Sequence, residues 1–399
     1  MNDGALKTSY ARIMYLVACA LSDKCPDLAQ LRGVDLEKLH SVAKKHSLGS
    51  LVCDALERVG LATDEMRRDF NMSIRKIMLL DAEREAILAE LERQKIRHMP
   101  LKGVIMKELY PKIGLREMTD NDILFDECDR ERVRDVFLAR GYDVKYYCMN
   151  QTHDVYIKDP VYNYEMHVSL IRPMALGEEI INFFDSSMDR SLPDGDGEYR
   201  RRMSDEDFYL FMKVHEYKHY IHSGIGLRLF ADTFLYMKNF GDKLDFEYMH
   251  GHFEKMGLSD YERTSRSLAM KLMDVDTAAR LSLGESDILT EEELEMFSYC
   301  SASGSYGLLT QEVENGIKRV EKESEGRRFL KLRYIVRRLF PQESYYETWY
   351  PFAYKHKWAR PFIVVWRFLK VLFRTPKRII IPFITVIKYK GKKNNEKRK

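Results

Sequence analysis

Two aspartates separated by one residue, Asp120 and Asp122, are the side chains whose types and spacing first indicate chemistry. They open a short apolar stretch that reads as a strand, and alternate residues of a strand point to the same face. The two carboxylates would share one face, while Ile123 and Phe125 would point to the other. Oxygen ligands grouped in this way suit a hard divalent cation such as Mg²⁺. The pair therefore predicts a metal site at the start of this strand.

The spacing alone decides little, because a chain with 62 acidic residues contains several such pairs. The neighbours of this pair distinguish it. Upstream, the Lys102-Gly103 turn opens a short helix, and the unpaired N–H groups of a helix N-terminus suit phosphate. Arg116 lies just before the pair, and Glu165 and His167 share one face of a later strand.

A third carboxylate on a neighbouring strand is what two-metal group transfer requires. We expect Asp120 and Asp122 to bridge two Mg²⁺ ions about 3.5–4 Å apart. Glu165 would complete one of the ion sites and help to remove a proton from an acceptor hydroxyl.

A competing pattern lies further along the chain, where residues 215–219 read His-Glu-Tyr-Lys-His. This matches H-E-x-x-H, in which two histidines on one helix face bind zinc and the glutamate activates water. Lys218 would place a cation beside that zinc, and the extended form of the motif fails at His222 and Ile225. We therefore rank a zinc hydrolase below a transferase and expect His215 to lie on a helix face that lines a cleft.

Arg228 and Asp232 are four residues apart on the next predicted helix. That spacing makes them neighbours on the helix surface and favours an ion pair between them, with a role in the cleft as the alternative.

The elements that must position these residues follow from the hydrophobic pattern. With 45% hydrophobic and 32% charged residues, the 399-residue chain is typical of a globular protein of several domains. We expect an α+β fold, with a small mixed β-sheet flanked by largely helical N- and C-terminal regions. The sheet should use strands at 98–101, 120–125, 142–148, 152–158 and 162–170.

The pattern divides the chain into four predicted domains. These are a helical N-terminal cap (1–95), a core that carries the sheet (96–175), a helical domain that completes the cleft (176–345) and a basic, aromatic, amphipathic tail (346–399). Six scattered cysteines without a C-x-x-C pair favour reduced thiols. The sequence shows no signal peptide and no apolar run of about 18–20 residues. We therefore expect a cytoplasmic protein, with peripheral attachment to the inner face of the membrane through its tail as an option.

The tail differs in charge from the rest of the chain. From residue 351 onward there are 15 Lys or Arg and one acidic residue, whereas the remainder has 50 basic and 61 acidic residues. Aromatic, basic, amphipathic stretches bind the headgroup region of anionic membranes. They also bind nucleic-acid backbones, which we rank below a membrane surface, and a plain packed or disordered terminus is the third reading.

Taken together, these motifs resemble the uncharacterised bacterial nucleotidyltransferase family of the polymerase-beta-type superfamily. The resemblance rests on Leu101-Lys102-Gly103, Tyr110-Pro111, Arg116, the Met118–Leu124 segment MTDNDIL, Glu165-Met166-His167, the His215 and His219 helix, and Gly226–Asp232. It implies that the core is a nucleotidyltransferase catalytic domain in which Asp120, Asp122 and Glu165 bind Mg²⁺. It also implies that Lys102, Gly103 and Arg116 lie near the triphosphate, although the usual glycine pair of the superfamily is here Lys-Gly.

The sequence therefore predicts an enzyme that moves NMP from an NTP to an acceptor and releases pyrophosphate. The resemblance suggests a sugar- or lipid-linked acceptor in surface polysaccharide synthesis. His167, His215, Arg228 and Asp232 are further candidates for nucleotide binding. The first alternative is a catalytically silent membrane-surface scaffold on the same fold.

Overall fold

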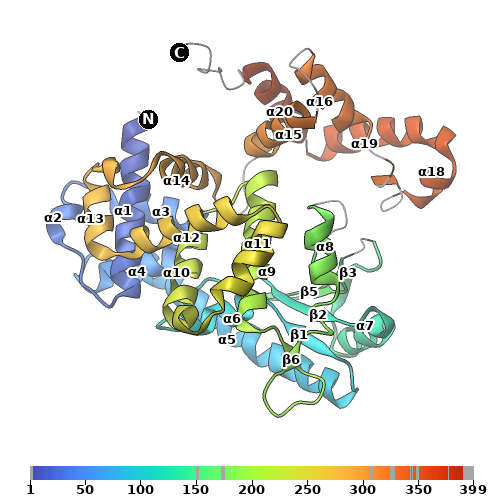
Figure 1. Cartoon of the computed structure of the whole chain (residues 1–399), viewed down its shortest axis with the longest axis horizontal. Coiled ribbons are helices and arrows are strands. Elements are labelled where there is room, and N and C mark those ends of the chain that lie inside the picture. Colours follow the sequence, from blue (N-terminus) through green and yellow to red (C-terminus); the bar gives the residue numbers. More distant parts are fainter. Residues whose placement is uncertain are drawn as a thin grey trace. The chain divides into compact units, whose positions relative to one another are not determined.

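The structure is a computed structural model, and the cartoon in Figure 1 follows the whole chain. The structure describes residues 3–149, 152–171, 176–304, 309–323, 329–341, 343, 345–346, 350–375 and 377–389. The chain divides into two compact units. The first comprises Met1–Lys218 and Ile225–Ser305, and the second comprises His219–Gly224 and Tyr306–Lys399. The four domains expected from the sequence remain a prediction.

The first unit begins with five helices: α1 (Asp3–Leu21), α2 (Leu28–Leu31), α3 (Leu36–Lys45), α4 (Gly49–Glu57) and α5 (Asp64–Arg93). Side-chain caps at Asp27, Asp35 and Thr63 begin α2, α3 and α5 by accepting from backbone N–H groups of the first turn. Helix α1 is buried almost throughout from Ala11 to Leu21, because it packs on α4, α12 and α13.

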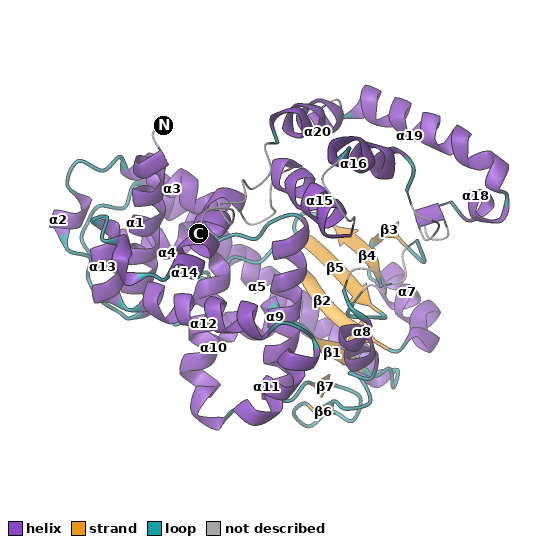
Figure 2. Ribbon diagram, turned by 45° about the horizontal axis from the view of Figure 1, so that its top comes forward, coloured by secondary structure: helices purple, strands orange, loops and turns teal. Residues whose placement is uncertain are grey.

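The sheet that follows is small and mixed, which confirms the predicted α+β class. Its strands are β1 (His98–Pro100), β2 (Asn121–Phe125), β3 (Asp143–Tyr146), β4 (His153–Lys158) and β5 (Tyr162–His167). They lie in the order β1-β2-β5-β4-β3, and β2 and β5 run parallel while the other neighbours run antiparallel (Figure 2). The connections carry α6 (Gly103–Met106), the 3₁₀ turns η1 (Lys107–Leu109) and η2 (Glu127–Asp129), and α7 (Arg130–Ala139).

The two faces of the sheet have different neighbours, as the alternation of residues in a strand requires. Ile123 and Phe125 join the cluster formed with α5 and α7, in which Phe137 stacks on Tyr156 at 4.3 Å between ring centroids. Leu124 joins the opposite cluster, which includes many residues of α9. Since Asp122 alternates with Ile123, its carboxylate shares the α9 side of the sheet.

The rest of the first unit is mainly helical, and its first four helices supply residues to the cluster on that side of the sheet. Its elements are α8 (Glu178–Asp185), the β6–β7 pair (Leu192–Pro193 and Arg201–Arg202), α9 (Asp205–His222, of which the part from His219 belongs to the second unit), α10 (Arg228–Phe240), η3 (Gly241–Lys243), α11 (Phe246–Lys255), α12 (Ser259–Met273), α13 (Val275–Ser282), η4 (Ser286–Ile288) and α14 (Glu291–Ser303). Helix α14 begins with a capping box formed by Thr290 and Glu293.

The second unit contains α15 (Leu309–Glu323), α16 (Leu330–Leu339), α18 (Pro351–Lys355), η5 (Lys357–Ala359), α19 (Arg360–Arg374) and α20 (Lys377–Lys388). Val313, Ile317, Tyr334 and Val386 belong to one buried cluster, which holds α16 and α20 against α15. Within the described part of the chain, no helix combines the length and the hydropathy needed to span a bilayer.

A buried ion pair ties the loop before β2 to helix α10. The Nε and Nη2 atoms of Arg116 donate to the two carboxylate oxygens of Asp232 at 2.9 and 3.0 Å, and the hydroxyl of Tyr110 donates to Asp232 at 2.8 Å. The sequence-based prediction of an ion pair between Arg228 and Asp232 is wrong, because the carboxylate oxygens of Asp232 accept from Arg116 and Tyr110. Arg228 donates to the carbonyl of Glu117.

Burial by itself would raise the pKa of Asp232, but the charge and hydrogen bonds of Arg116 outweigh that effect and lower it. The pair therefore stabilises the fold when Asp232 is ionised. We predict that Asp232→Asn destabilises the protein by about 3–5 kcal/mol at neutral pH, because Arg116 would be left buried without its counter-charge. Urea unfolding measures this, with the exposed Asp242→Asn as the control, which should change stability by less than about 0.5 kcal/mol.

The difference in the free energy of unfolding between wild type and Asp232→Asn should also depend on pH. A carboxylate whose pKa is lowered by folding contributes stability above its unfolded pKa of about 3.9 and loses it as the pH falls. The difference between wild type and Asp232→Asn should therefore narrow below about pH 4. A difference that stays constant from pH 7 to pH 3 would show that the ionised pair is not its source.

Candidate active site

Three carboxylates gather where β2 and β5 lie side by side. The parallel register of these strands places Asp122 opposite Glu165, and Asp120 stands one residue before β2. Asp122 is buried, whereas Asp120 and Glu165 are half-buried. The structure thus brings together, on the α9 side of the sheet, the carboxylates that the alternation predicted.

Two histidines continue this row of side chains across β5 to β4. The antiparallel register pairs His153 with His167, and Glu165 precedes His167 by two residues on the same face. His167 Nε2 lies 2.7 Å from Asp122 Oδ1 and 3.8 Å from Glu165 Oε2, and His153 Nε2 lies 3.9 Å from the same Glu165 oxygen. His153 was not predicted from the sequence.

The close approach of these acids shifts their pKa values in different directions. Burial would raise the pKa of Asp122, but Lys102 and the hydrogen bond with His167 lower it well below its usual range. Burial and the charge of Asp122 raise the pKa of Asp120. Burial, Asp122 and Asp120 raise the pKa of Glu165 to about 7. A divalent cation among these groups would remove their mutual repulsion, so the donor set fits such an ion.

Cationic side chains surround the carboxylates. Lys102 Nζ lies 3.3 Å from Asp122 Oδ2, and its backbone has a φ of +43°, which is uncommon for a residue other than glycine. The charge of Arg228 acts on Asp120, and the charge of Lys218 acts on Glu165 and His167. Lys218, considered from the sequence only as an obstacle to zinc, therefore belongs electrostatically to this site.

Gly103 and Arg116 are in contact beside Lys102. A Cβ atom at residue 103 would lie 2.8 Å from both Arg116 Nη1 and Met118 Sδ, so a larger residue would displace these side chains. Arg116 is buried and its guanidinium is engaged by Asp232. Close packing at the turn is thus one reason why residue 103 is a glycine. Direct contact of Arg116 or Asp232 with a nucleotide stays a prediction.

The H-E-x-x-H segment lies in α9, but its glutamate is engaged elsewhere. Glu216 is buried and its carboxylate binds Lys213 Nζ at 2.9 Å, while Lys213 also donates to Thr233 and Ser265. A glutamate held in this way is not placed to activate water on zinc. Among the described residues, the group with metal-ligand proximity is His153, Glu165 and His167. The zinc hydrolase alternative therefore gains no support.

His215 lies on the same helix, half-buried, with its ring centroid 6.2 Å from that of Phe211. Lys102 Nζ lies 5.9 Å from the centroid of the same Phe211 ring. His215 and Lys102 are therefore both neighbours of Phe211, and a role of His215 in lining a cleft stays a prediction.

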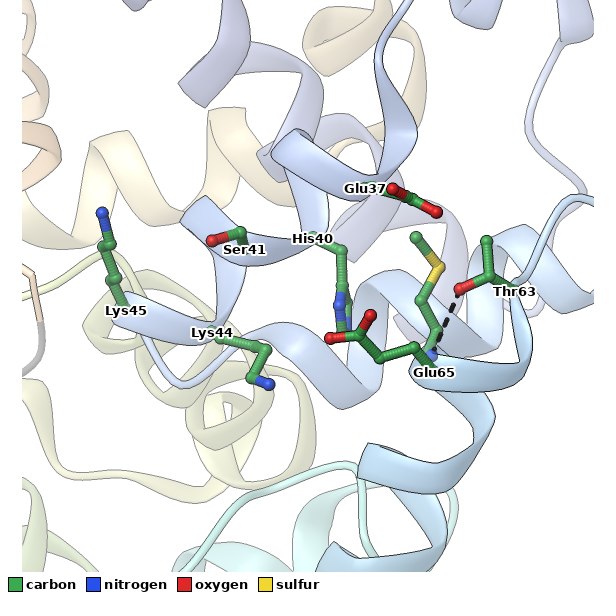
Figure 3. Close-up of a pocket in the computed structure, with 8 residues that line it drawn as sticks. Glu37, His40, Ser41, Lys44, Lys45, Thr63 and Glu65 are labelled. Atoms are coloured by element: carbon green, nitrogen blue, oxygen red, sulfur yellow. Dashed lines mark hydrogen bonds between the residues drawn. The ribbon is translucent and has the colours of Figure 1, made fainter.

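A hollow of about 340 Å³ lies elsewhere in the first unit, between α3 and the start of α5 (Figure 3). Acidic and basic side chains are mixed along its wall, which includes Glu37, His40, Lys44 and Glu65. None of the predicted site residues lines it, so we do not assign the site to this hollow.

Comparison with known proteins identifies a family that includes this chain. A protein family described as uncharacterised nucleotidyltransferase matches residues 32–274, which include every site residue discussed above. No curated protein and no solved structure matches the chain. Nucleotidyl transfer requires a nucleoside triphosphate as donor, and enzymes of this kind usually use divalent metal ions. The chain belongs to this nucleotidyltransferase family and is an enzyme that transfers a phosphorus-containing group.

Proposed function

We propose that the protein is a Mg²⁺-dependent enzyme that moves NMP from an NTP to an acceptor hydroxyl or phosphate at the face carrying Asp120, Asp122 and Glu165. The observation that carries the proposal is the gathering of these carboxylates in one place with cationic side chains around them. Acids alone would hold a metal, and cations alone would hold phosphate. Their combination suits a metal–triphosphate complex.

The three carboxylates have different roles in the proposed reaction. Asp120 and Asp122 would hold the ions, and Glu165 would complete one ion site and accept the proton of the acceptor hydroxyl. Bound Mg²⁺ would supply neutralisation of phosphate charge and would lower the pKa of the acceptor hydroxyl. The acceptor oxygen forms a bond to the α-phosphorus as the bond to the β-phosphate breaks, and pyrophosphate leaves.

The cationic groups would orient the triphosphate. Lys102 and Lys218 would meet phosphate oxygens, and Arg228 would add positive charge near Asp120. Arg116 would act as a positioning residue, because it binds Asp232 on one side and packs against Gly103 on the other. His167 would orient Asp122 through its hydrogen bond.

Binding of nucleotide provides a test that requires no knowledge of the acceptor. A ligand that binds only the native state raises stability by about 2.7 kcal/mol at one hundred times its Kd, which shifts Tm by several degrees. We predict such a shift with at least one of ATP, GTP, CTP and UTP, dependent on Mg²⁺. The Asp120→Asn/Asp122→Asn double variant should lose the shift, because the metal would lose its ligands.

The matched control is Asp242→Asn/Asp287→Asn, which removes the same charge from two exposed positions and should retain the full shift. No shift with any NTP in the wild type would favour the catalytically silent scaffold. A shift that persists in Asp120→Asn/Asp122→Asn would show that nucleotide binds away from these carboxylates.

We also propose that the second unit attaches the enzyme to an anionic membrane surface, which suits a lipid- or sugar-linked acceptor. Helix α19 carries a row of exposed apolar side chains at helical spacing: Phe362, Val365, Trp366, Leu369 and Phe373. Phe373 is 80% exposed and Phe362 is 69% exposed. Helix α20 adds a second row, formed by Ile380, Phe383, Ile384 and Ile387.

The charge of this region favours a membrane over another apolar partner. Arg367 and Lys370 lie on α19 beside the exposed apolar row, and the sequence from residue 351 onward carries a large excess of basic residues. Apolar side chains at the acyl boundary combined with cations near the headgroups are the features that bind amphipathic helices to anionic lipid. Nucleic acid would bind the cationic side chains but would leave most of the two apolar rows exposed.

Sedimentation with vesicles tests this attachment. We predict that the full-length protein binds phosphatidylcholine vesicles containing phosphatidylglycerol, and that Trp366→Glu/Phe373→Glu weakens binding at least tenfold. The control Met72→Glu/Leu283→Glu places the same charges at exposed apolar positions of the first unit and should bind as wild type does. Equal binding by both variants, or no binding to anionic vesicles, would contradict the attachment.

A further inference from the structure

The row of side chains across the sheet contains two histidines, His153 and His167, which are possible metal ligands in addition to the carboxylates. One ligand atom from each of His153, Glu165 and His167 lies within 4.8 Å of the others. These residues lie on two adjacent strands in a fixed register, so backbone pairing holds their Cα atoms in place. Separations of this size require only small side-chain rotations to enclose one ion.

Two imidazole nitrogens and a carboxylate are not the donor set that Mg²⁺ prefers. Mg²⁺ takes oxygen ligands, whereas imidazole suits first-row transition ions such as Fe²⁺, Ni²⁺ and Zn²⁺. A site built only for Mg²⁺ would require no histidine at the positions flanking Glu165. The types of the donors therefore indicate which ion this end of the site selects.

The surroundings of both histidines support ligation of a metal ion. Nδ1 of the His167 ring is buried without a hydrogen-bond partner among the described residues. Thr152 Oγ1 lies 3.1 Å from His153 Nδ1 and can orient that ring. Asp122 contacts His167 Nε2, so a carboxylate fixes the orientation of this ring, as is usual for histidines that bind metal.

We propose that His153, Glu165 and His167 bind a first-row transition divalent cation, such as Fe²⁺, at the Glu165 end of the site, and Mn²⁺ serves as its paramagnetic probe. This inference deepens the proposed function, because it assigns a different ion to one of the two expected metal positions. The carboxylates Asp120 and Asp122 would keep the position suited to Mg²⁺. His153 would then be a metal ligand that the three-carboxylate prediction omits.

The decisive measurement detects the nitrogen ligands directly. Metal-free full-length protein is loaded with one equivalent of Mn²⁺, and electron spin echo envelope modulation is recorded with and without excess Mg²⁺. We expect ¹⁴N couplings typical of coordinated imidazole, which should persist in Mg²⁺. Bound Mn²⁺ without ¹⁴N coupling, or complete displacement by Mg²⁺, would overturn the proposal.

Variants assign the couplings to residues. His153→Phe keeps a ring of similar size and should weaken Mn²⁺ binding at least tenfold while reducing the ¹⁴N coupling. His250→Phe, at an exposed position on α11, should leave both unchanged. Unchanged binding and coupling in His153→Phe would overturn the assignment, and the wild-type spectrum decides the matter if this variant does not fold.

The two proposals fail in distinguishable ways. Nitrogen-ligated Mn²⁺ in a protein that binds no NTP would support this metal site and refute the proposed transfer function. Mg²⁺-dependent binding of NTP by a protein whose Mn²⁺ lacks ¹⁴N coupling would do the reverse.

Discussion

The pairing of β2 with β5 is the constraint on which the rest of the site depends. Their parallel register sets Asp122 opposite Glu165, and the alternation of each strand turns both carboxylates to one face. Like charges so close together repel each other. That repulsion is partly balanced by Lys102 and by the hydrogen bond from His167. In the proposed function the same arrangement would bind cations, because a divalent ion would replace this repulsion with coordination.

The surrounding elements serve to hold this face in a fixed geometry. Helices α5 and α7 fill the opposite side of the sheet with apolar contacts, so the strands have a rigid support. On the face that carries Asp122 and Glu165, α9 brings Lys218 near Glu165, and the Arg116–Asp232 pair connects the loop before β2 to α10. Arg116 in turn fills the space beside Gly103, which defines the turn that carries Lys102. A buried ion pair distant in sequence therefore influences the position of a phosphate-binding candidate.

The sequence was sufficient for the local part of this account. Strand alternation predicted that Asp120 and Asp122 share a face of one strand, that Glu165 and His167 share a face of another, and that Glu165 joins the two aspartates. The register places Asp122 opposite Glu165. The role of His153 could not be read, because it depends on how β4 pairs with β5. The Arg228–Asp232 pair was predicted from helical spacing, but Arg116, 116 residues away from Asp232, is the actual partner. Glu216 matched a zinc motif in the sequence. The sequence does not show that the carboxylate of Glu216 is buried and bound by Lys213.

In the proposed function, the carboxylate face binds metal ions together with nucleotide. The most direct test is anomalous diffraction from crystals grown with Mn²⁺ and a non-hydrolysable NTP analogue. We expect two Mn²⁺ peaks about 3.5–4 Å apart, between Asp120, Asp122 and Glu165, with the triphosphate directed toward Lys102. Metal and triphosphate bound together at any other place on the protein would contradict the proposed function.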